Sequence, residues 1–166
     1  MRPYNVSDDH GFTILEALIV VVIVGIIFAF SAPSYLAWSQ RKKVDSAISS
    51  IEGAIKEAQR QAIAQSRTCN VTFDAASSPP QVRSTTSGNC LVTGSRELTG
   101  VTLEASPTSL NIDFSGNALT SVTVVVTHTT NTNLKRCLVL SQPLGLIRTG
   151  NYTGTAALTD SSRCNS

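Results

Sequence analysis

Few of the groups that usually carry catalysis are present in this sequence of 166 residues. It has neither a Gly-x-Ser-x-Gly nucleophile elbow nor a phosphate-binding glycine loop, and its four cysteines form no Cys-x-x-Cys pair. His128, the one histidine beyond the N-terminal segment, sits among threonines, and we expect it in a solvated loop. The net charge of +2 argues against broad coating of nucleic acid. The sequence therefore predicts a protein that is not an enzyme and holds no metal or cofactor.

Charge is also missing from a long stretch near the N-terminus. No charged residue lies between Glu16 and Arg41, and residues 17–32 are almost wholly apolar. A helix over residues 12–32 would rise about 30 Å, the hydrocarbon thickness of a bilayer. Glu16 would cost about 1–3 kcal/mol in such a run, and carboxylates placed in this way are usually functional.

Three interpretations of this segment compete. A secretory signal peptide should have a basic start and a cleavage site of small residues, for which residues 29–31 would serve. However, residues 1–11 hold one arginine and two aspartates, and Pro33 follows the cleavage site closely. A plain membrane anchor leaves Glu16 and the preceding Gly-Phe junction unexplained. The third interpretation is a resemblance to a known family.

The segment Gly11–Glu16, Gly-Phe-Thr-Ile-Leu-Glu, resembles the prepilin-peptidase site of type IV pilins and pseudopilins. In that family a short leader is cut after Gly, and the new N-terminal Phe is N-methylated. The resemblance implies cleavage between Gly11 and Phe12, N-methylphenylalanine at Phe12, and a role for Glu16 in assembly. It also implies three partners: a prepilin peptidase/methyltransferase, other pilins or pseudopilins in a filament, and the inner membrane. Gly25 and Pro33 match helix-softening positions of such pilins.

The implied topology is a single-pass inner-membrane protein whose C-terminal domain lies in the periplasm before it enters a pilus or pseudopilus. One observation points the other way. Arg41, Lys42 and Lys43 follow the apolar segment, and the positive-inside rule would place that side in the cytoplasm.

The four cysteines, at positions 69, 90, 137 and 164, favour two disulfides in a small exported domain. Three pairings are possible, and the sequence alone does not choose among them. We predict the short-range pairing, Cys69–Cys90 with Cys137–Cys164. Its loops of about 20 and 27 residues would each contribute about 3 kcal/mol in the loop-entropy treatment.

Beyond Pro33 a second apolar pattern follows, at helical spacing. Its members are separated by four and three residues: Val44, Ile48, Ile51, Ile55, Ala58 and Ala62. We expect this stripe to pack on the protein's own sheet rather than on a coiled-coil partner.

From Cys69 onward the sequence is rich in Thr, Ser and Val, and its period becomes two, as in antiparallel strands joined by short turns. The predicted strands are Cys69–Phe73, Gln81–Arg83, Glu97–Leu103, Leu110–Phe114, Ser121–Thr127, Lys135–Leu140 and Leu146–Arg148. Turns are predicted at 77–80, 87–89, 115–117 and 129–133.

Together these patterns and the resemblance predict an α+β protein with a type IV pilin-like fold. We expect a leader over 1–11 and a long N-terminal helix over 12–67, membrane-spanning over 12–32 and amphipathic over 33–67. That helix should pack on an antiparallel β-sheet domain over 68–166.

The C-terminal half resembles the FimT/GspH group, which comprises minor pilins of type IV pili and minor pseudopilins of type II secretion. The resemblance implies a structural subunit acting in assembly priming or at the filament tip. The alternative is capture of DNA in natural transformation, because this group often ends in Gly-Arg-x-Arg. The matching segment here is Gly145-Leu146-Ile147-Arg148, so Arg148 carries over, and Lys135 and Arg136 would complete a basic patch.

Overall fold

The computed structural model describes residues 12–85, 90–154 and 160–165, apart from the side chains of residues 30–33. The leader, including Gly11, and the turn predicted at 87–89 lie outside the described residues. The chain divides into two compact units, Met1–Trp38 and Ser39–Ser166.

Helix α1 (Ile14–Ala64) begins at a capping residue, Thr13. The Glu16 backbone N–H donates to Thr13 Oγ1 at 3.3 Å, and the Ala17 N–H donates to the Thr13 carbonyl at 3.1 Å. Thr-x-x-Glu at a helix start is the capping-box pattern, which satisfies N–H groups that have no helical partner. The helix therefore starts two residues later than the predicted Phe12.

The C-terminal end of α1 is a Schellman motif. The Arg67 N–H donates to the Ala62 carbonyl at 3.1 Å, and the Ser66 N–H donates to the Ile63 carbonyl at 3.2 Å. Ser66 has φ of 51°, the left-handed conformation that this motif requires and that glycine usually supplies. Because a serine occupies that position, the sequence carried no clear stop signal, and the helix ends at Ala64 rather than at the predicted residue 67.

Among the described residues, no single helix is both long and apolar enough to cross a membrane. Two segments of α1 on either side of a bend, Ile14–Ala29 and Ser34–Ala64, meet that requirement together, by length and composition. In the sequence, residues 30–33 separate the two segments. A membrane span over residues 12–32 stays a prediction.

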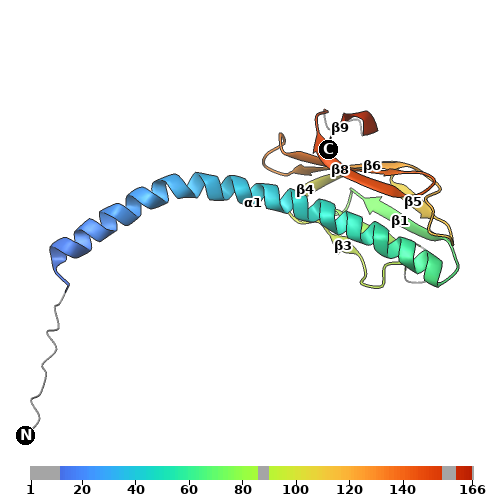
Figure 1. Cartoon of the computed structure of the whole chain (residues 1–166), viewed down its shortest axis with the longest axis horizontal. Coiled ribbons are helices and arrows are strands. Elements are labelled where there is room, and N and C mark those ends of the chain that lie inside the picture. Colours follow the sequence, from blue (N-terminus) through green and yellow to red (C-terminus); the bar gives the residue numbers. More distant parts are fainter. Residues whose placement is uncertain (1–11, 86–89, 155–159, 166) are drawn as a thin grey trace, which may run out of the picture. The chain divides into compact units, whose positions relative to one another are not determined.

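The second unit contains two sheets, shown in Figure 1, and every strand pairing among the described residues is antiparallel. One sheet has the order β3-β2-β1-β5, formed by β1 (Cys69–Asp74), β2 (Gln81–Ser84), β3 (Arg96–Glu97) and β5 (Ser109–Ile112). The other has the order β4-β6-β7-β8-β9, formed by β4 (Val101–Ser106), β6 (Val122–His128), β7 (Lys135–Ser141), β8 (Leu146–Tyr152) and β9 (Cys164–Asn165). A short 3-10 helix, η1 (Ser161–Arg163), precedes β9.

The second half of α1 supplies one wall of a core that both sheets share. All six stripe residues predicted from helical spacing are buried, among them Val44, Ile51 and Ile55 at 0 % exposure. They belong to one cluster with buried residues of both sheets, such as Leu110 of β5 and Leu138 of β7. The prediction that this stripe packs on the protein's own sheets is confirmed.

One strand prediction is wrong. The segment Glu97–Leu103 is not a single strand, because β3 ends at Glu97, β4 begins at Val101, and the two belong to different sheets. Gly100 between them has φ of +74°, which breaks an extended backbone and which glycine adopts without steric cost. In addition, β8 continues to Tyr152, beyond the predicted Arg148, and β9 was not foreseen.

Strand β6 also departs from the expected alternation, because all seven of its residues are buried. It is an interior strand, flanked by β4 and β7. Its Val122, Val124 and Val126 join the main core, whereas Val125 joins a second, smaller cluster. That cluster comprises Val125, Cys137, Val139, Tyr152 and Cys164, so side chains of β6, β7, β8 and the edge strand β9 form a second apolar group apart from the main core.

Candidate assembly and processing site

The first unit presents an apolar surface with no cover within its own unit. Every side chain from Phe12 to Ala29 is exposed, and Phe12, Ile14 and Leu15 have exposed fractions of 74 %, 89 % and 72 %. Apolar surfaces this extensive mark contacts with a membrane or with other proteins. The segment that begins at the predicted processing junction is therefore suited to lie in lipid or among other apolar helices.

Glu16 lies in the first turn of α1, where a carboxylate is favoured by the positive end of the helix dipole. Its position at the third residue after Thr13 completes the capping-box pattern. Its own carboxylate makes no ion pair with any residue that the structure describes. Glu16 thus has a local role in starting the helix and a charge that remains available to another chain. The Thr-x-x-Glu spacing signals this local role, which was not among the predictions for Glu16.

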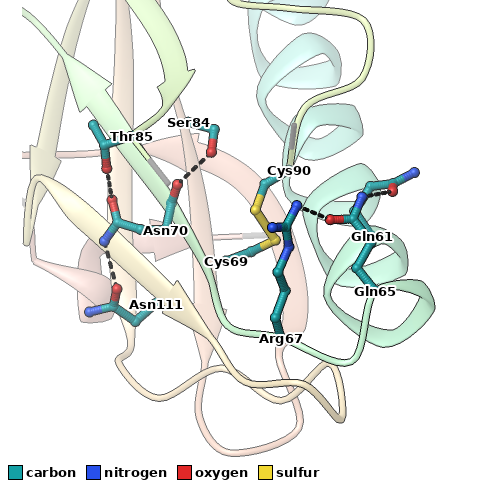
Figure 2. The surroundings of a disulfide bond; sticks show 9 residues. All are labelled: Gln61, Gln65, Arg67, Cys69, Asn70, Ser84, Thr85, Cys90 and Asn111. Carbon is teal, nitrogen blue, oxygen red and sulfur yellow. Dashed lines mark hydrogen bonds between the residues drawn. A yellow bond between two sulfur atoms is a disulfide. The ribbon is translucent and has the colours of Figure 1, made fainter. Parts of the chain in front are cut away.

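The first disulfide joins Cys69, at the start of β1, to Cys90, with a Cα–Cα distance of 5.7 Å. Both cysteines are buried, and the Arg67 side chain lies beside the bond and donates to Gln65 (Figure 2). The second disulfide joins Cys137 of β7 to Cys164 of β9. These are the two short-range pairs predicted from the sequence. The second one ties the C-terminal strand to the sheet.

Next to the first disulfide, Asn70 connects three segments through its side chain and backbone (Figure 2). Its Nδ2 donates to Asn111 Oδ1 at 2.6 Å, and its Oδ1 accepts from Thr85 Oγ1 at 2.6 Å. Its backbone carbonyl accepts from Ser84 Oγ at 3.1 Å. Strand β1 is therefore held to both of its neighbours, β2 and β5, by side chains as well as by the sheet ladder.

The three basic residues proposed for a DNA patch do not converge. Arg136 Nε donates to Asp45 Oδ1 of α1 at 2.8 Å, and its Nη1 donates to Asn151 Oδ1 at 2.9 Å. Lys135 Nζ donates to the Gly154 carbonyl, and Arg148 Nη2 donates to the Ser161 carbonyl, each at 3.0 Å. Successive residues of a strand point to opposite faces, so Arg136 and Lys135 diverge.

The register sets the distance between the two remaining cations. Arg136 pairs with Asn151 and Val139 pairs with Arg148, so Lys135 and Arg148 belong to the same face of the sheet. They are nevertheless four positions apart along the strand direction, which corresponds to about 13 Å. That face therefore presents two separated cations, each already hydrogen-bonded to a carbonyl.

A carboxylate on α1 holds the segment that precedes β3. Glu57 accepts from the Thr93 backbone N–H at 3.1 Å, from Thr93 Oγ1 at 2.9 Å and from Arg96 Nη2 at 2.9 Å. Burial acts to raise the pKa of Glu57, but the hydrogen bonds from Thr93 and Arg96 outweigh it and hold the pKa below its usual value. The charged carboxylate is therefore the form that the folded domain prefers.

Two other carboxylates have shifted pKa values. Partial burial raises the pKa of Glu104, and the nearby charge of Lys135 opposes that rise. Hydrogen bonds from Ser162 lower the pKa of Asp160 at the start of η1. Neither group lies in a cluster of three His, Cys, Asp or Glu suited to a metal ion, and the described part of the chain contains no such cluster.

The expectation for His128 is wrong, since this residue is the last of β6 and only 4 % exposed. Its Nδ1 accepts from the backbone N–H groups of Thr130 and Asn131, at 3.2 and 3.3 Å. A ring nitrogen in this position satisfies the donors of a tight turn, as an Asx side chain would. His128 is therefore a buried structural residue that holds the turn after β6.

Both the N-terminal motif and the fold have counterparts among known proteins. The sequence matches the prokaryotic N-terminal methylation motif over residues 7–32. A crystal structure of the type IV minor pilin FimU from Pseudomonas aeruginosa is similar, with a TM-score of 0.53 and 16 % identity, over 67 % of this chain and 90 % of that one. A second crystal form of FimU covers 64 % of this chain and 91 % of its own, with 18 % identity and a TM-score of 0.49. No curated protein matches the sequence. At this identity the likeness shows a shared fold.

Proposed function

We propose that this chain, which has a type IV pilin-like fold and carries the prokaryotic methylation motif, is a minor pilin or pseudopilin. It acts as a structural subunit of a type IV pilus or a type II secretion pseudopilus, in assembly priming or at the tip. The observation that carries the proposal is the exposed apolar surface of residues 12–29, which begins at the processing motif. Such a surface needs lipid before assembly and neighbouring helices afterwards.

In this proposal the leader is removed between Gly11 and Phe12, and the new amine of Phe12 is methylated. Before assembly the mature subunit resides in the inner membrane with its domain in the periplasm. The two disulfides support a periplasmic location, because disulfides persist in oxidising compartments. As the subunit enters the filament, the lipid around its helix is replaced by the helices of other subunits.

Glu16 sets the axial position of the subunit in the filament. Its carboxylate is one of the few charges near the apolar surface, and the amine of a neighbouring Phe12 is the matching positive group. Removing one partner of an ion pair in a low-dielectric environment leaves the other charge uncompensated and costs about 3–5 kcal/mol. Assembly should therefore depend on Glu16 far more than folding of the domain does.

The decisive experiment compares Glu16→Gln with Thr13→Ala in the native host. Glutamine at this position retains the capping-box pattern and removes only the charge, whereas Thr13→Ala removes the cap and keeps the charge. We expect Glu16→Gln to be cleaved, to insert and to form both disulfides. Its share in sheared filaments, relative to the membrane pool, should fall at least about tenfold, since 1.4 kcal/mol already corresponds to that factor.

Equal incorporation of Glu16→Gln and the unaltered chain would refute a role in assembly. A loss confined to Thr13→Ala would mean that assembly requires the helix cap and not the charge, whereas an equal loss in both variants would mean that it requires both. Mass spectrometry of the mature protein tests processing in the same samples: an N-methylated Phe12 is expected, and Gly11→Val should leave the full-length chain. A mature N-terminus at Ala32 would instead indicate a secretory signal peptide.

A further inference from the structure

A groove in the second unit lies between α1 and strands β7 and β8. Its volume is about 410 Å³, and it is lined by Arg41, Asp45, Leu134, Arg136 and Asn151. That volume falls within the range of about 300–1,000 Å³ typical of small-molecule sites. Two guanidinium groups, one carboxylate, one amide and one leucine make it a small polar site with an apolar wall.

The groove has a net positive charge and an unused set of donors. The guanidinium of Arg136 is held in place, because its Nε and Nη1 donate to Asp45 and Asn151 while its Nη2 bonds to no described residue. Arg41 is exposed and has no hydrogen bond or ion pair with any residue that the structure describes. With Asp45 neutralised by Arg136, the charge of Arg41 remains for an anion. Guanidinium groups offer paired N–H donors that match the oxygens of a phosphate.

We propose that this groove binds the phosphate of an anionic lipid headgroup while the subunit is in the membrane. This inference rests on the proposed function, which makes the chain a membrane protein before assembly. Arg41 comes only nine residues after Ala32, where the apolar stretch ends, and two further cations, Lys42 and Lys43, follow it. Clusters of basic residues next to a membrane segment attract anionic lipids.

The aromatic residues between the apolar stretch and the groove residues support a lipid ligand. Tyr35 and Trp38 lie in the first unit, with ring centroids 5.9 Å apart and exposed fractions of 65 % and 55 %. Tyrosine and tryptophan are enriched where membranes meet water. Their position in the sequence, directly before Arg41, is that of an interfacial belt followed by a headgroup site. A headgroup ligand also explains why the basic residues Arg41–Lys43 follow the apolar segment on the periplasmic side, where the positive-inside rule disfavours positive charge.

A nucleic acid is a poorer ligand for this groove, because binding a duplex requires several phosphate contacts and Arg41 is the single lining cation without a partner among the described residues. The test uses the full mature chain in detergent and native mass spectrometry with added phosphatidylglycerol or phosphatidylcholine. The variants are Arg41→Gln and, as the matched control, Arg60→Gln. Arg60 is another exposed arginine of α1, and it does not line the groove.

We expect a phosphatidylglycerol adduct on the unaltered chain and on Arg60→Gln, about fivefold weaker binding to Arg41→Gln, and no comparable adduct with phosphatidylcholine. Inorganic phosphate at equal concentration should not displace the lipid. Arg41 makes no bond within the described chain, so its replacement should leave the melting temperature unchanged, and the binding result then reports the groove alone.

Equal binding by Arg41→Gln and the unaltered chain would overturn the inference. Equal weakening by the two variants would reveal general surface charge, and full displacement by inorganic phosphate would reveal a site for free anions; either result also overturns it. Reduced filament entry of Arg41→Gln with unchanged lipid binding would assign the groove to a neighbouring subunit instead. If the unaltered chain is processed, inserted and assembled yet binds no lipid, this inference fails while the proposed function stands.

Discussion

Glu57 of α1 accepts hydrogen bonds from Thr93 and Arg96, and removing its charge tests how strongly these bonds hold the segment before β3 to the helix. We consider Glu57→Gln, which keeps the size of the side chain and removes its charge. The Glu57 side chain is 12 % exposed and the Arg96 side chain is 34 % exposed, so water screens the pair only in part. In the variant, the Thr93 backbone N–H, Thr93 Oγ1 and Arg96 Nη2 face a neutral amide. Its single oxygen would have to accept from all three donors.

The size of the effect follows from these contacts. Hydrogen bonds to a charged group contribute about 1.5–3 kcal/mol each, but those that share one carboxylate do not add. Breaking a fully buried pair costs about 3–5 kcal/mol, which is an upper bound here because Arg96 reaches solvent. We therefore expect Glu57→Gln to lower the free energy of unfolding by about 2–3 kcal/mol. For a domain of this size that corresponds to a melting temperature lower by about 10 °C.

The dependence on pH gives the same prediction a second readout. The pKa of Glu57 is lowered from its ordinary value of 4.5, so its contribution is fully present above pH 4.5. It is lost as the pH falls through the lower pKa of the folded state. The stability difference between the unaltered chain and Glu57→Gln should therefore be constant from pH 7 to about pH 5 and should shrink below pH 4.5.

Thermal unfolding of the full mature chain in detergent, followed by circular dichroism at several pH values, measures both quantities. Glu52→Gln is the matched control, on the same helix, because Glu52 forms an exposed i,i+4 pair with Lys56. Such a pair contributes only about 0.3–0.5 kcal/mol. A Glu57→Gln chain as stable as the Glu52→Gln chain, or a difference that does not shrink in acid, would refute the reasoning.

Two further predictions concern the helix end and the basic residues. Ser66→Gly should raise the free energy of unfolding by about 0.5–1 kcal/mol, because Ser66 has φ of 51°, and a lower denaturant midpoint would contradict the assigned left-handed conformation. DNA binding by the full chain in detergent should vary with salt with a slope no steeper than about −1 in log K against log salt, since the cations near β8 do not form one site. A gel shift with a slope near about −2.7 that Arg148→Gln abolishes would show a site of three phosphate contacts instead.

The helical part of the fold could be predicted because its signals are local. The apolar stripe from Val44 to Ala62 repeats at the helical period, and any element with that pattern must bury one face. The strands of the second unit were also visible as short runs of β-branched residues between turn residues. What the pattern could not supply was the assignment of strands to two sheets, because pairing depends on contacts between distant segments.

The features that were predicted wrongly have one physical cause in common: their structure depends on tertiary contacts rather than on local sequence. His128 is polar and follows a run of valines, yet its ring replaces water as the acceptor for the next turn. The end of α1 rests on a serine in a conformation that serine rarely adopts. The break at Gly100 interrupts residues that otherwise fit one strand, and only the separation of β3 from β4 into two sheets makes a turn necessary there.

The basic residues near the C-terminus show why a partial motif does not carry its function with it. In the group that this chain resembles, Gly-Arg-x-Arg places two arginines two residues apart on one face of a strand. Here Leu146 occupies the first of these positions and is 66 % exposed, so that face begins with an apolar side chain followed by Arg148. Lys135 lies on the same face but about 13 Å away along the strands, and Arg136 points to the opposite face, toward Asp45. Because salt-dependent affinity grows with the number of phosphates contacted together, cations dispersed in this way favour a subunit held by its helix over one that captures DNA.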